Sequence, residues 1–344
     1  PHVGKVRCCD PALWREPQGR VWLSWCQTTG EKIFGKVNER GSRYLSAWGI
    51  YCDNPEDDEP VWSAPRRLFD GNMMNKPTYL ENGDILYCLC VPLFFNINDL
   101  RSREEGLWIY RSKDNGQTFE KISGVRLPSS ATESMLVEKK DGTIWLWSRV
   151  DPILLYRQYN REKKTFVDKG VPTDGIYEAF SKDGGVTFTR ALPSKIPHVG
   201  SRFYVGRLQS GNLLLVKNYA NDELWLSGKP KAKIGEGDKE INLNPKFRRQ
   251  IIAYLSRDDG KTWEGGLILD ERRLVNYPDA SQSADGFIYI SWDHDRYNEP
   301  EIMAAKITEA DILAKKIVTP GSTLNEIINK GPQGKTARNR TKNI

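Results

Sequence analysis

A short pattern recurs five times along the 344-residue chain: a glycine within a turn sequence, followed at once by a run of apolar, β-branched or aromatic residues. Asn-Gly, Asp-Gly or Ser-Gly before such a run indicates a hairpin, because glycine tolerates positive φ. Strand-rich units with a period of about 60–75 residues predict a β-propeller of four-stranded antiparallel blades. The copies are "QGRVWLSW", "NGDILYCL", "DGTIWLWS", "SGNLLLVK" and "DGFIYISW", with turn glycines Gly19, Gly83, Gly142, Gly211 and Gly286.

A second motif, S-x-D-x-G-x-T-aromatic, occurs three times: "SKDNGQTF" from Ser112, "SKDGGVTF" from Ser181 and "SRDDGKTW" from Ser256. We call these segments the S-x-D turns. Their Ser and Asp side chains can bond backbone N–H groups of a tight turn, and the aromatic residue can pack between sheets. We therefore predict that they fasten hairpins and are not catalytic acids. Helical signal is almost confined to "TEADILAKK" near the end.

The S-x-D turns resemble the Asp-box (BNR) repeats of the sialidase superfamily. Four further segments resemble bacterial sialidase-like proteins in the same order: "GNMMNKPTYLENGDIL", "TESMLVEKKDGTIWLWSR", "SRFYVGRLQSGNLLLV" and "NYPDASQSADGFIYISWDHDR". The resemblance covers roughly residues 7 to 315. It implies an all-β propeller, most often six-bladed, and we expect the two chain ends to share the last blade. We expect one propeller domain over residues 1–320 and a basic, disordered tail over 321–344.

The net charge of +6 depends on this tail, since the last fifteen residues, "KGPQGKTARNRTKNI", contain five Lys or Arg and no acid. The rest of the chain is near neutral, so its overall charge neither favours nor excludes an acidic substrate. We expect no nucleic-acid partner, although a polyanion-binding tail is the alternative. No apolar run is long enough to span a membrane.

The six cysteines all precede residue 91, and none forms a C-x-x-C pair, so a zinc ribbon or redox motif is not predicted. We interpret them as small buried residues, with a disulfide such as Cys9–Cys26 left open. No H-x-x-x-H sequence or dense carboxylate cluster indicates a metal site. We expect neither a metal nor a cofactor.

The resemblance to sialidases implies a site with three arginines around the sugar carboxylate, a tyrosine nucleophile, an activating glutamate and an aspartate acid/base. "TESMLVE…DGTIWLWSR" resembles the stretch with the glutamate and one arginine, here Glu133 and Arg149. "RRQIIAYLSRDDG" resembles the strand with another arginine, here Arg249, with Arg248 as the competitor. "NYPDASQ" resembles the nucleophile segment, which makes Tyr277 the tyrosine. The alternatives are a surface acid, a solvated basic pair and a turn tyrosine.

Two positions depart from the family pattern. Cys9 stands where the remaining arginine is expected, and Arg7 is the candidate to replace it, because residues two apart share one face of a strand. The region expected to carry the acid/base, "QTTGEKIFGKVNERGSRYL", contains no Asp, and its only acids are Glu31 and Glu39. Either a carboxylate elsewhere replaces the aspartate, or the chemistry differs.

Other polar residues stand beside apolar strands. Asn75 and Lys76 in "NMMNKPT", and Arg202 in "SRFYVGR", precede runs expected to be first strands of blades. In "SWDHDR", Asp293 and His294 end an apolar strand, and a histidine between carboxylates can act as a general acid or base. The alternative is a solvated turn that closes the last hairpin.

We therefore predict an exo-acting glycoside hydrolase, sialidase-like, that removes a terminal acidic sugar such as sialic acid. Glu133 and Tyr277 would form the nucleophilic pair. Two alternatives stay open: another glycan-active propeller of rhamnosidase or polysaccharide-lyase type that uses a histidine, and a non-catalytic glycan-binding propeller. Fold-level likeness cannot separate them. We expect a monomer with a glycan substrate, located in the periplasm or secreted.

Overall fold

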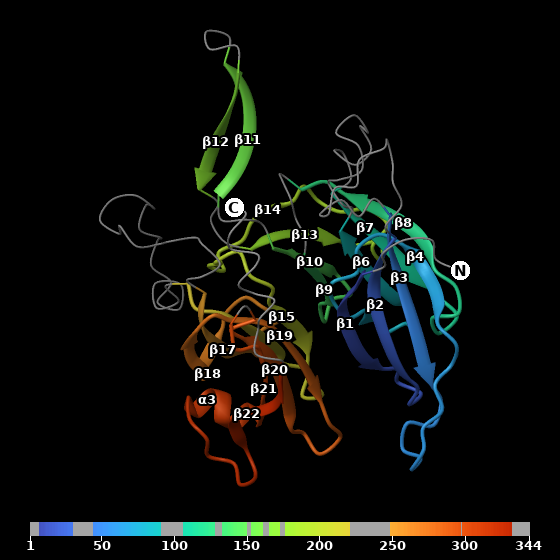
Figure 1. The fold of residues 1–344 in the computed structure, drawn as a ribbon, viewed down its shortest axis with the longest axis vertical. Helices are drawn as coiled ribbons and strands as arrows, with labels where there is room; N and C mark the ends of the chain where they lie inside the picture. The colour runs from blue at the N-terminus through green and yellow to red at the C-terminus, as the bar shows by residue number, and fades with distance from the viewer. Residues whose placement is uncertain are drawn as a thin grey trace. The chain divides into compact units, whose positions relative to one another are not determined.

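The computed structural model describes residues 7–29, 44–90, 106–127, 133–149, 153–160, 165–172, 176–220, 248–296 and 298–331. The regular secondary structure of these residues is β-strand apart from one short helix, α3 (Glu309–Ala314), which lies within the predicted helical segment. The chain divides into two compact units whose relative placement is not determined (Figure 1). Unit 1 contains Pro1–Val150 and Tyr177–Leu192, and unit 2 contains Asp151–Ile176 and Pro193–Ile344.

Unit 1 contains three four-stranded antiparallel sheets. In each sheet the strands follow one another in chain order from one edge to the other. The first sheet is β1 (Arg7–Arg15), β2 (Val21–Thr29), β3 (Tyr44–Cys52) and β4 (Arg66–Asp70); the second is β5 (Thr78–Tyr79), β6 (Ile85–Cys90), β7 (Leu107–Ser112) and β8 (Glu120–Val125); the third is β9 (Ser134–Glu138), β10 (Ile144–Ser148), β13 (Tyr177–Ser181) and β14 (Leu192–Pro193).

Unit 2 contains two more sheets of the same kind and a hairpin whose two strands pair with each other. The fourth sheet is β15 (Tyr204–Arg207), β16 (Leu213–Asn218), β17 (Arg249–Ser256) and β18 (Glu264–Arg273); the fifth is β19 (Val275–Gln282), β20 (Ile288–His294), β21 (Glu301–Ile307) and β22 (Thr323–Lys330). The hairpin is β11 (Ile153–Asn160) and β12 (Thr165–Pro172).

The five sheets are the blades of an all-β propeller, which confirms the predicted fold class and blade architecture. The predicted number of six blades is wrong, because the described residues form five four-stranded sheets. Among the described residues, the last blade is built from β19 to β22 and the first from β1 to β4, so the N-terminal strand does not complete the last blade as expected. Each of the five repeated glycines stands two residues before the second strand of a blade, and all five have positive φ. One turn glycine therefore marks one blade.

The S-x-D turns connect the third and fourth strands of blades two, three and four. In the first copy, Ser112 Oγ donates to Asp114 Oδ1 at 2.7 Å and accepts from the Gly116 N–H at 2.8 Å. Asp114 also accepts from the backbone N–H and the hydroxyl of Thr118. The other two copies repeat all four bonds. These carboxylates are occupied within their own turns, as their predicted structural role requires.

The corresponding connection of the fifth blade is built around helix α3 and the buried Asp311. Asp311 closes a capping box with Thr308, and it accepts further bonds from the Val318 and Thr319 N–H groups and from the Ser322 hydroxyl. These donors hold the pKa of Asp311 at about 2, although burial opposes them. The segment carries the chain into β22, so residues 323–330 of the predicted tail belong to the last blade. Residues 332–344 lie outside the described part.

The cores are built from the apolar faces of these strands. In unit 1, Trp14 stacks on Trp22 with ring centroids 5.4 Å apart, within a cluster that joins the first two blades. In unit 2, buried aliphatic residues of both blades pack together around Trp292. Four cysteines are buried, whereas Cys8 is exposed and Cys9 half-buried, and all six are free thiols. Cys9 lies directly opposite Cys26 across β1 and β2.

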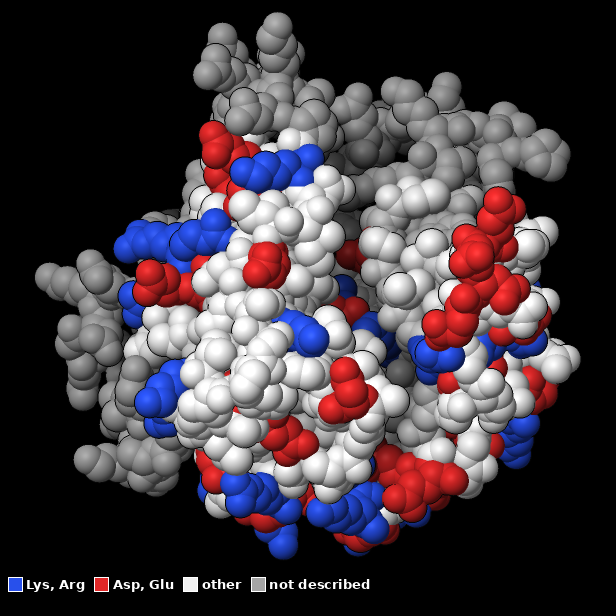
Figure 2. Space-filling view, turned by 90° about the horizontal axis from the view of Figure 1, so that it is seen from below, with Lys and Arg blue, Asp and Glu red and all other residues white. Residues whose placement is uncertain are grey.

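Charged side chains are mixed on the surface that Figure 2 presents. Lys and Arg are interspersed with Asp and Glu among uncharged residues, so this face carries no field of a single sign. Within the described residues, no helix has the length and apolar character needed to cross a membrane.

Candidate functional site

Tyr277 occupies an unusual backbone position in the first strand of the last blade. A bulge interrupts the pairing of β19 with β20 between Asn276 and Asp279. Tyr277 lies in this bulge with a φ of 55°, in the left-handed region that bulky residues rarely adopt. Such strain persists where the surrounding structure enforces it, and it gathers at functional sites. Its backbone geometry alone therefore makes Tyr277 a candidate functional residue.

Two arginines lie over the ring of Tyr277. The Cζ atom of Arg296 is 4.3 Å from the ring centroid, and that of Arg248 is 5.7 Å away. Arg248 is only 7% exposed, and its guanidinium donates to Asn276 Oδ1 at 2.9 Å and to the Gly200 carbonyl at 2.6 Å. Because these bonds fix Arg248, its positive charge is held in place beside the tyrosine.

Asp293 completes this group, which we call the Tyr277 cluster: Tyr277, Arg248, Arg296, Asn276 and Asp293. Asp293 lies opposite Asn276 across β19 and β20 and forms an ion pair with Arg296. Burial raises the pKa of Asp293, and the charges of Arg296 and Arg248 and the Asn276 amide oppose this only in part. About 20% of its side-chain surface is exposed, while its Oδ1 atom is buried.

A second pair in unit 2 stands next to the bulge. The buried Arg202, just before β15, lies 3.8 Å from the carboxylate of Asp279, two residues beyond Tyr277. Burial and the charge of Asp279 both raise the pKa of the neighbouring Tyr204 phenol. Unit 2 thus brings three arginines and two aspartates to one segment. A carboxylate or another anion is the ligand that such fixed, planar donors suit best.

Unit 1 brings together three other predicted site residues. Glu133, 1% exposed and just before β9, forms an ion pair with Arg149, which follows β10. The backbone N–H of Arg149 donates to the Glu133 carbonyl at 3.0 Å. Asn75 is also buried and donates to the Ser134 carbonyl at 2.8 Å. Burial raises the pKa of the Cys90 thiol to about 12, and the nearby charge of Glu133 adds to that shift.

The two predicted members of the nucleophilic pair lie in different units, Glu133 in unit 1 and Tyr277 in unit 2. Their pairing stays a prediction. Lys76 is half-buried before β5. Arg7 begins β1, but its side chain lies outside the described part, as do Glu31 and Glu39.

The structure places Arg249 outside the Tyr277 cluster. Arg249 begins β17 with an exposed side chain, and its Cζ lies 4.7 Å from the ring centroid of Tyr219. The adjacent Arg248 is the residue that contacts Asn276 and Tyr277. We therefore assign to Arg248 the position that the sequence pattern gave to Arg249, since only Arg248 is buried at the cluster.

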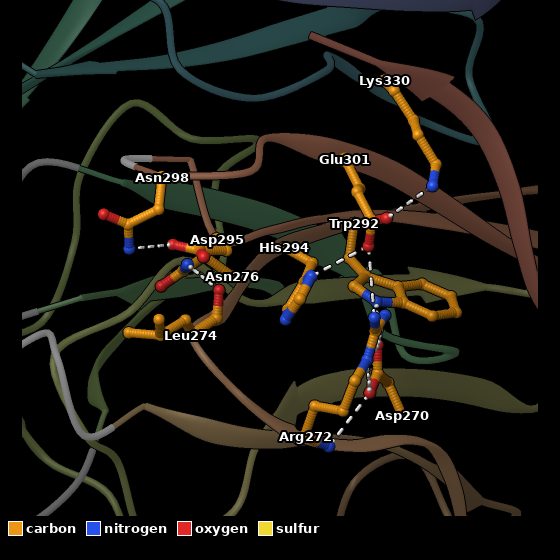
Figure 3. Close-up of polar contacts among 10 residues, drawn as sticks. All are labelled: Asp270, Arg272, Leu274, Asn276, Trp292, His294, Asp295, Asn298, Glu301 and Lys330. Atoms are coloured by element: carbon orange, nitrogen blue, oxygen red, sulfur yellow. Dashed lines mark hydrogen bonds and ion pairs between the residues drawn. The ribbon is translucent and has the colours of Figure 1, made fainter. Parts of the chain in front are cut away.

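His294 does not share the surroundings of Asp293. Its Nδ1 lies 2.9 Å from Glu301, which also pairs with Arg272 at 3.2 Å and with Lys330 at 3.4 Å (Figure 3). Arg272 in turn binds the buried Asp270. Consecutive residues of a strand point to opposite faces, so Asp293 and His294 separate into two networks. His294 thus lies in a charge network of the last blade with Glu301, and its catalytic role stays a prediction.

Three residues of the cluster, Arg248, Arg296 and Asn276, were not among the predicted site residues, and Asn276 lies in the quoted "NYPDASQ" segment without an assigned role. Arg248 was named only as a competitor, and Arg296 lies in the quoted "SWDHDR" segment without an assigned role. The available signal was the arginine three residues after Asp293, a spacing that allows an ion pair across a turn. Among the described residues, no three His, Cys, Asp or Glu side chains are grouped as metal ligands.

The repeated blades and their turns define a β-propeller, and comparison with known proteins places it in a family. Residues 4–290 match the model of the BNR repeat-like domain, and the chain belongs to that family. No curated protein sequence matches it. The predicted kinship with sialidase-like BNR-repeat proteins is thereby confirmed.

Two solved structures share the fold at low identity. A protein of unknown function from Dyadobacter fermentans DSM 18053 is 13% identical, with a TM-score of 0.53 over 94% of this chain and 84% of that one. The Hadza microbial sialidase Hz136 is 17% identical, with a TM-score of 0.54 over 83% of this chain and 50% of that one. This chain thus matches half the length of the sialidase.

Proposed function

We propose that the protein is a retaining, exo-acting glycoside hydrolase that removes a terminal acidic sugar, with Tyr277 as its nucleophile. The observation that carries this proposal is the strained tyrosine with two arginines over its ring, one of them fixed by bonds to Asn276 and Gly200. The family and the fold shared with a microbial sialidase add support. Sialidases are the glycosidases that use a tyrosine in place of a second carboxylate.

The roles of the residues follow from their charges. Arg202 and Arg248 would bind the sugar carboxylate through paired N–H donors, which fixes the anomeric carbon near Tyr277. The phenol oxygen attacks that carbon as the bond to the leaving oxygen breaks, and a glycosyl-tyrosine forms. Water then releases the sugar with retained configuration. Positive charge from Arg296 and Arg248 beside the ring favours the developing phenolate, and Glu133 stays the predicted acceptor of the phenolic proton.

A non-catalytic glycan-binding propeller is the second candidate. The absence of an aspartate from "QTTGEKIFGKVNERGSRYL" and the cysteine at position 9 favour it. A histidine-based mechanism has less support, because His294 is held by Glu301 within a network of structural charges.

A panel of aryl glycosides with one common leaving group tests the proposal. We expect turnover of an acidic member, an α-sialoside or a uronide, at a kcat/KM at least about 10²-fold above that of its uncharged amide, because the buried arginines lose their partner in the amide. Neutral rhamnosides and xylosides serve as controls. Equal turnover of acid and amide, or no turnover of any member, would contradict the proposal.

A further inference from the structure

The proposed reaction needs a proton donor for the leaving oxygen. A natural glycoside leaves as an alcohol, and its departure without a proton is slow. The segment expected to supply an aspartate contains none. In the proposed reaction another carboxyl group takes this role, and the described residues of unit 2 include two beside Tyr277, Asp279 and Asp293.

Asp279 has a neighbour at each of its two carboxylate oxygens. One oxygen faces the buried guanidinium of Arg202 at 3.8 Å, and the other accepts from the Ala280 N–H at 3.0 Å. Both carboxylate oxygens are thus engaged by neighbours, and Asp279 suits the positioning of Arg202.

Asp293 differs from Asp279 in its surroundings. Its Oδ2 binds Arg296, but its Oδ1 is buried and receives no well-aligned hydrogen bond from any described residue, although the Asn276 amide lies beside it. That amide also donates to the Leu274 carbonyl at 2.8 Å, and its oxygen accepts from Arg248. Burial of a carboxylate with so few donors is costly, which favours the protonated form.

The same arginine links Asp293 to the nucleophile. Arg296 pairs with Asp293 while its Cζ lies 4.3 Å from the ring centroid of Tyr277. The groups that face Asp293 are Arg296 from the turn after β20, Asn276 from β19 and Arg248 from the residue before β17. Burial outweighs these three and raises the pKa of Asp293. The carboxyl group thus retains a proton into a higher pH range than an ordinary aspartate does.

We propose that Asp293 is the general acid and base of the site. In the first step its O–H protonates the glycosidic oxygen while the bond from that oxygen to the anomeric carbon breaks. The Tyr277 oxygen bonds to the same carbon and gives its proton to Glu133, its predicted acceptor. In the second step the Asp293 carboxylate takes a proton from water as the water oxygen displaces Tyr277, which regains its own proton from Glu133. The leaving alcohol and the sugar are released, and Asp293 ends protonated as it began. This inference rests on the proposed function.

The test compares Asp293→Asn with the wild type on acidic glycosides that share one sugar and differ in leaving group. Asparagine has nearly the same shape but cannot donate the required proton. We expect the rate of glycoside cleavage to fall about 10²- to 10⁴-fold for alkyl leaving groups and less than about tenfold for dinitrophenyl. Azide, which needs no base, should restore turnover of the dinitrophenyl glycoside. The decline of wild-type activity at high pH should be absent from the variant.

The matched control is Asp295→Asn. Asp295 lies two residues away at positive φ, which asparagine tolerates, and its Oδ1 accepts from Asn298 instead of contacting an arginine of the cluster. This variant should keep wild-type dependence on the leaving group. An equal loss on all leaving groups in Asp293→Asn, without azide rescue, would overturn the role of Asp293 alone. Full activity of Tyr277→Phe would overturn the proposed function, and no wild-type turnover of any glycoside would overturn both.

Discussion

Tyr277→Phe abolishes turnover of every glycoside that the wild-type protein cleaves, with an expected loss in kcat of at least about 10³-fold, the scale seen when a nucleophile is removed. The substitution deletes one oxygen and keeps the aromatic ring. Arg248 and Arg296 keep their contacts with that ring, and Phe meets the same backbone strain at a φ of 55° as Tyr does. The folded structure is therefore preserved, and the loss reports the chemistry. The measurement is steady-state kinetics, with thermal unfolding as the check on folding.

His294→Gln is the matched control for this variant. Glutamine can still donate a hydrogen bond to Glu301, and His294 lies in the charge network of Arg272 and Lys330 instead of the Tyr277 cluster. We expect kcat within about threefold of the wild type, because a substitution away from the reacting groups has a small effect. Activity that survives Tyr277→Phe but not His294→Gln would support a histidine-based mechanism and contradict ours.

Arg248→Met reduces kcat/KM for an acidic sugar by about 10²- to 10³-fold, the cost of removing one charged, preorganised donor. The effect on the uncharged amide of the same sugar should be below about tenfold, because the amide does not depend on the positive charge. Arg248→Lys should fall between the wild type and Arg248→Met, since lysine keeps the charge but lacks the planar fork. The measurement is the ratio of kcat/KM values for acid and amide in each variant.

Arg249→Met is the control that separates the two neighbouring arginines. Arg249 is exposed and lies over Tyr219, so its removal should change kcat/KM by less than about threefold. The opposite pattern, with Arg249→Met inactive and Arg248→Met active, would contradict the assignment of the buried position to Arg248. Loss in Arg248→Met that is equal for acid and amide would show a structural effect instead of carboxylate binding.

The repeated turn glycines in the sequence indicated the number of blades better than the resemblance to a family did. Five turn glycines predict five hairpins, and each stands just before the second strand of one blade. The prediction of six blades came from the commonest number in the sialidase superfamily. The local signal was the better guide, because a glycine at positive φ is required by each individual turn.

The site was less predictable than the blades. Residue type alone does not decide which side chains meet there, because neighbouring residues face different surroundings. Arg248 and Arg249 are adjacent and chemically identical, yet only one is buried beside Asn276. Asp293 and His294 are adjacent as well, and the register of β20 against β19 sends them to different partners. A one-residue error in register would exchange the two roles. The register depends on the bulge at Tyr277, and no turn motif in the sequence predicts that bulge.

Glu133 shows what the sequence could supply. Its resemblance to the activating glutamate singled out Glu133 and Arg149 as site residues, and the structure shows Glu133 buried and paired with Arg149 at the entry to β9. The acid at the end of the last blade was harder to find, since an aspartate before a histidine and an arginine is typical of a solvated turn. Only its burial and its ion pair with Arg296 distinguish Asp293 from such a turn.

The central claim is that Tyr277 forms a covalent bond to the sugar, and trapping that bond tests it most directly. An acidic sugar with a fluorine beside the anomeric carbon and a fluoride leaving group reacts once and is hydrolysed slowly, so the intermediate accumulates. Digestion at low pH and mass spectrometry then locate the added mass. We predict one sugar per protein, on the peptide that contains Tyr277, and none in Tyr277→Phe. An adduct on a different residue would contradict the role of Tyr277. Rapid turnover of the fluorinated sugar with no adduct at all would contradict it as well.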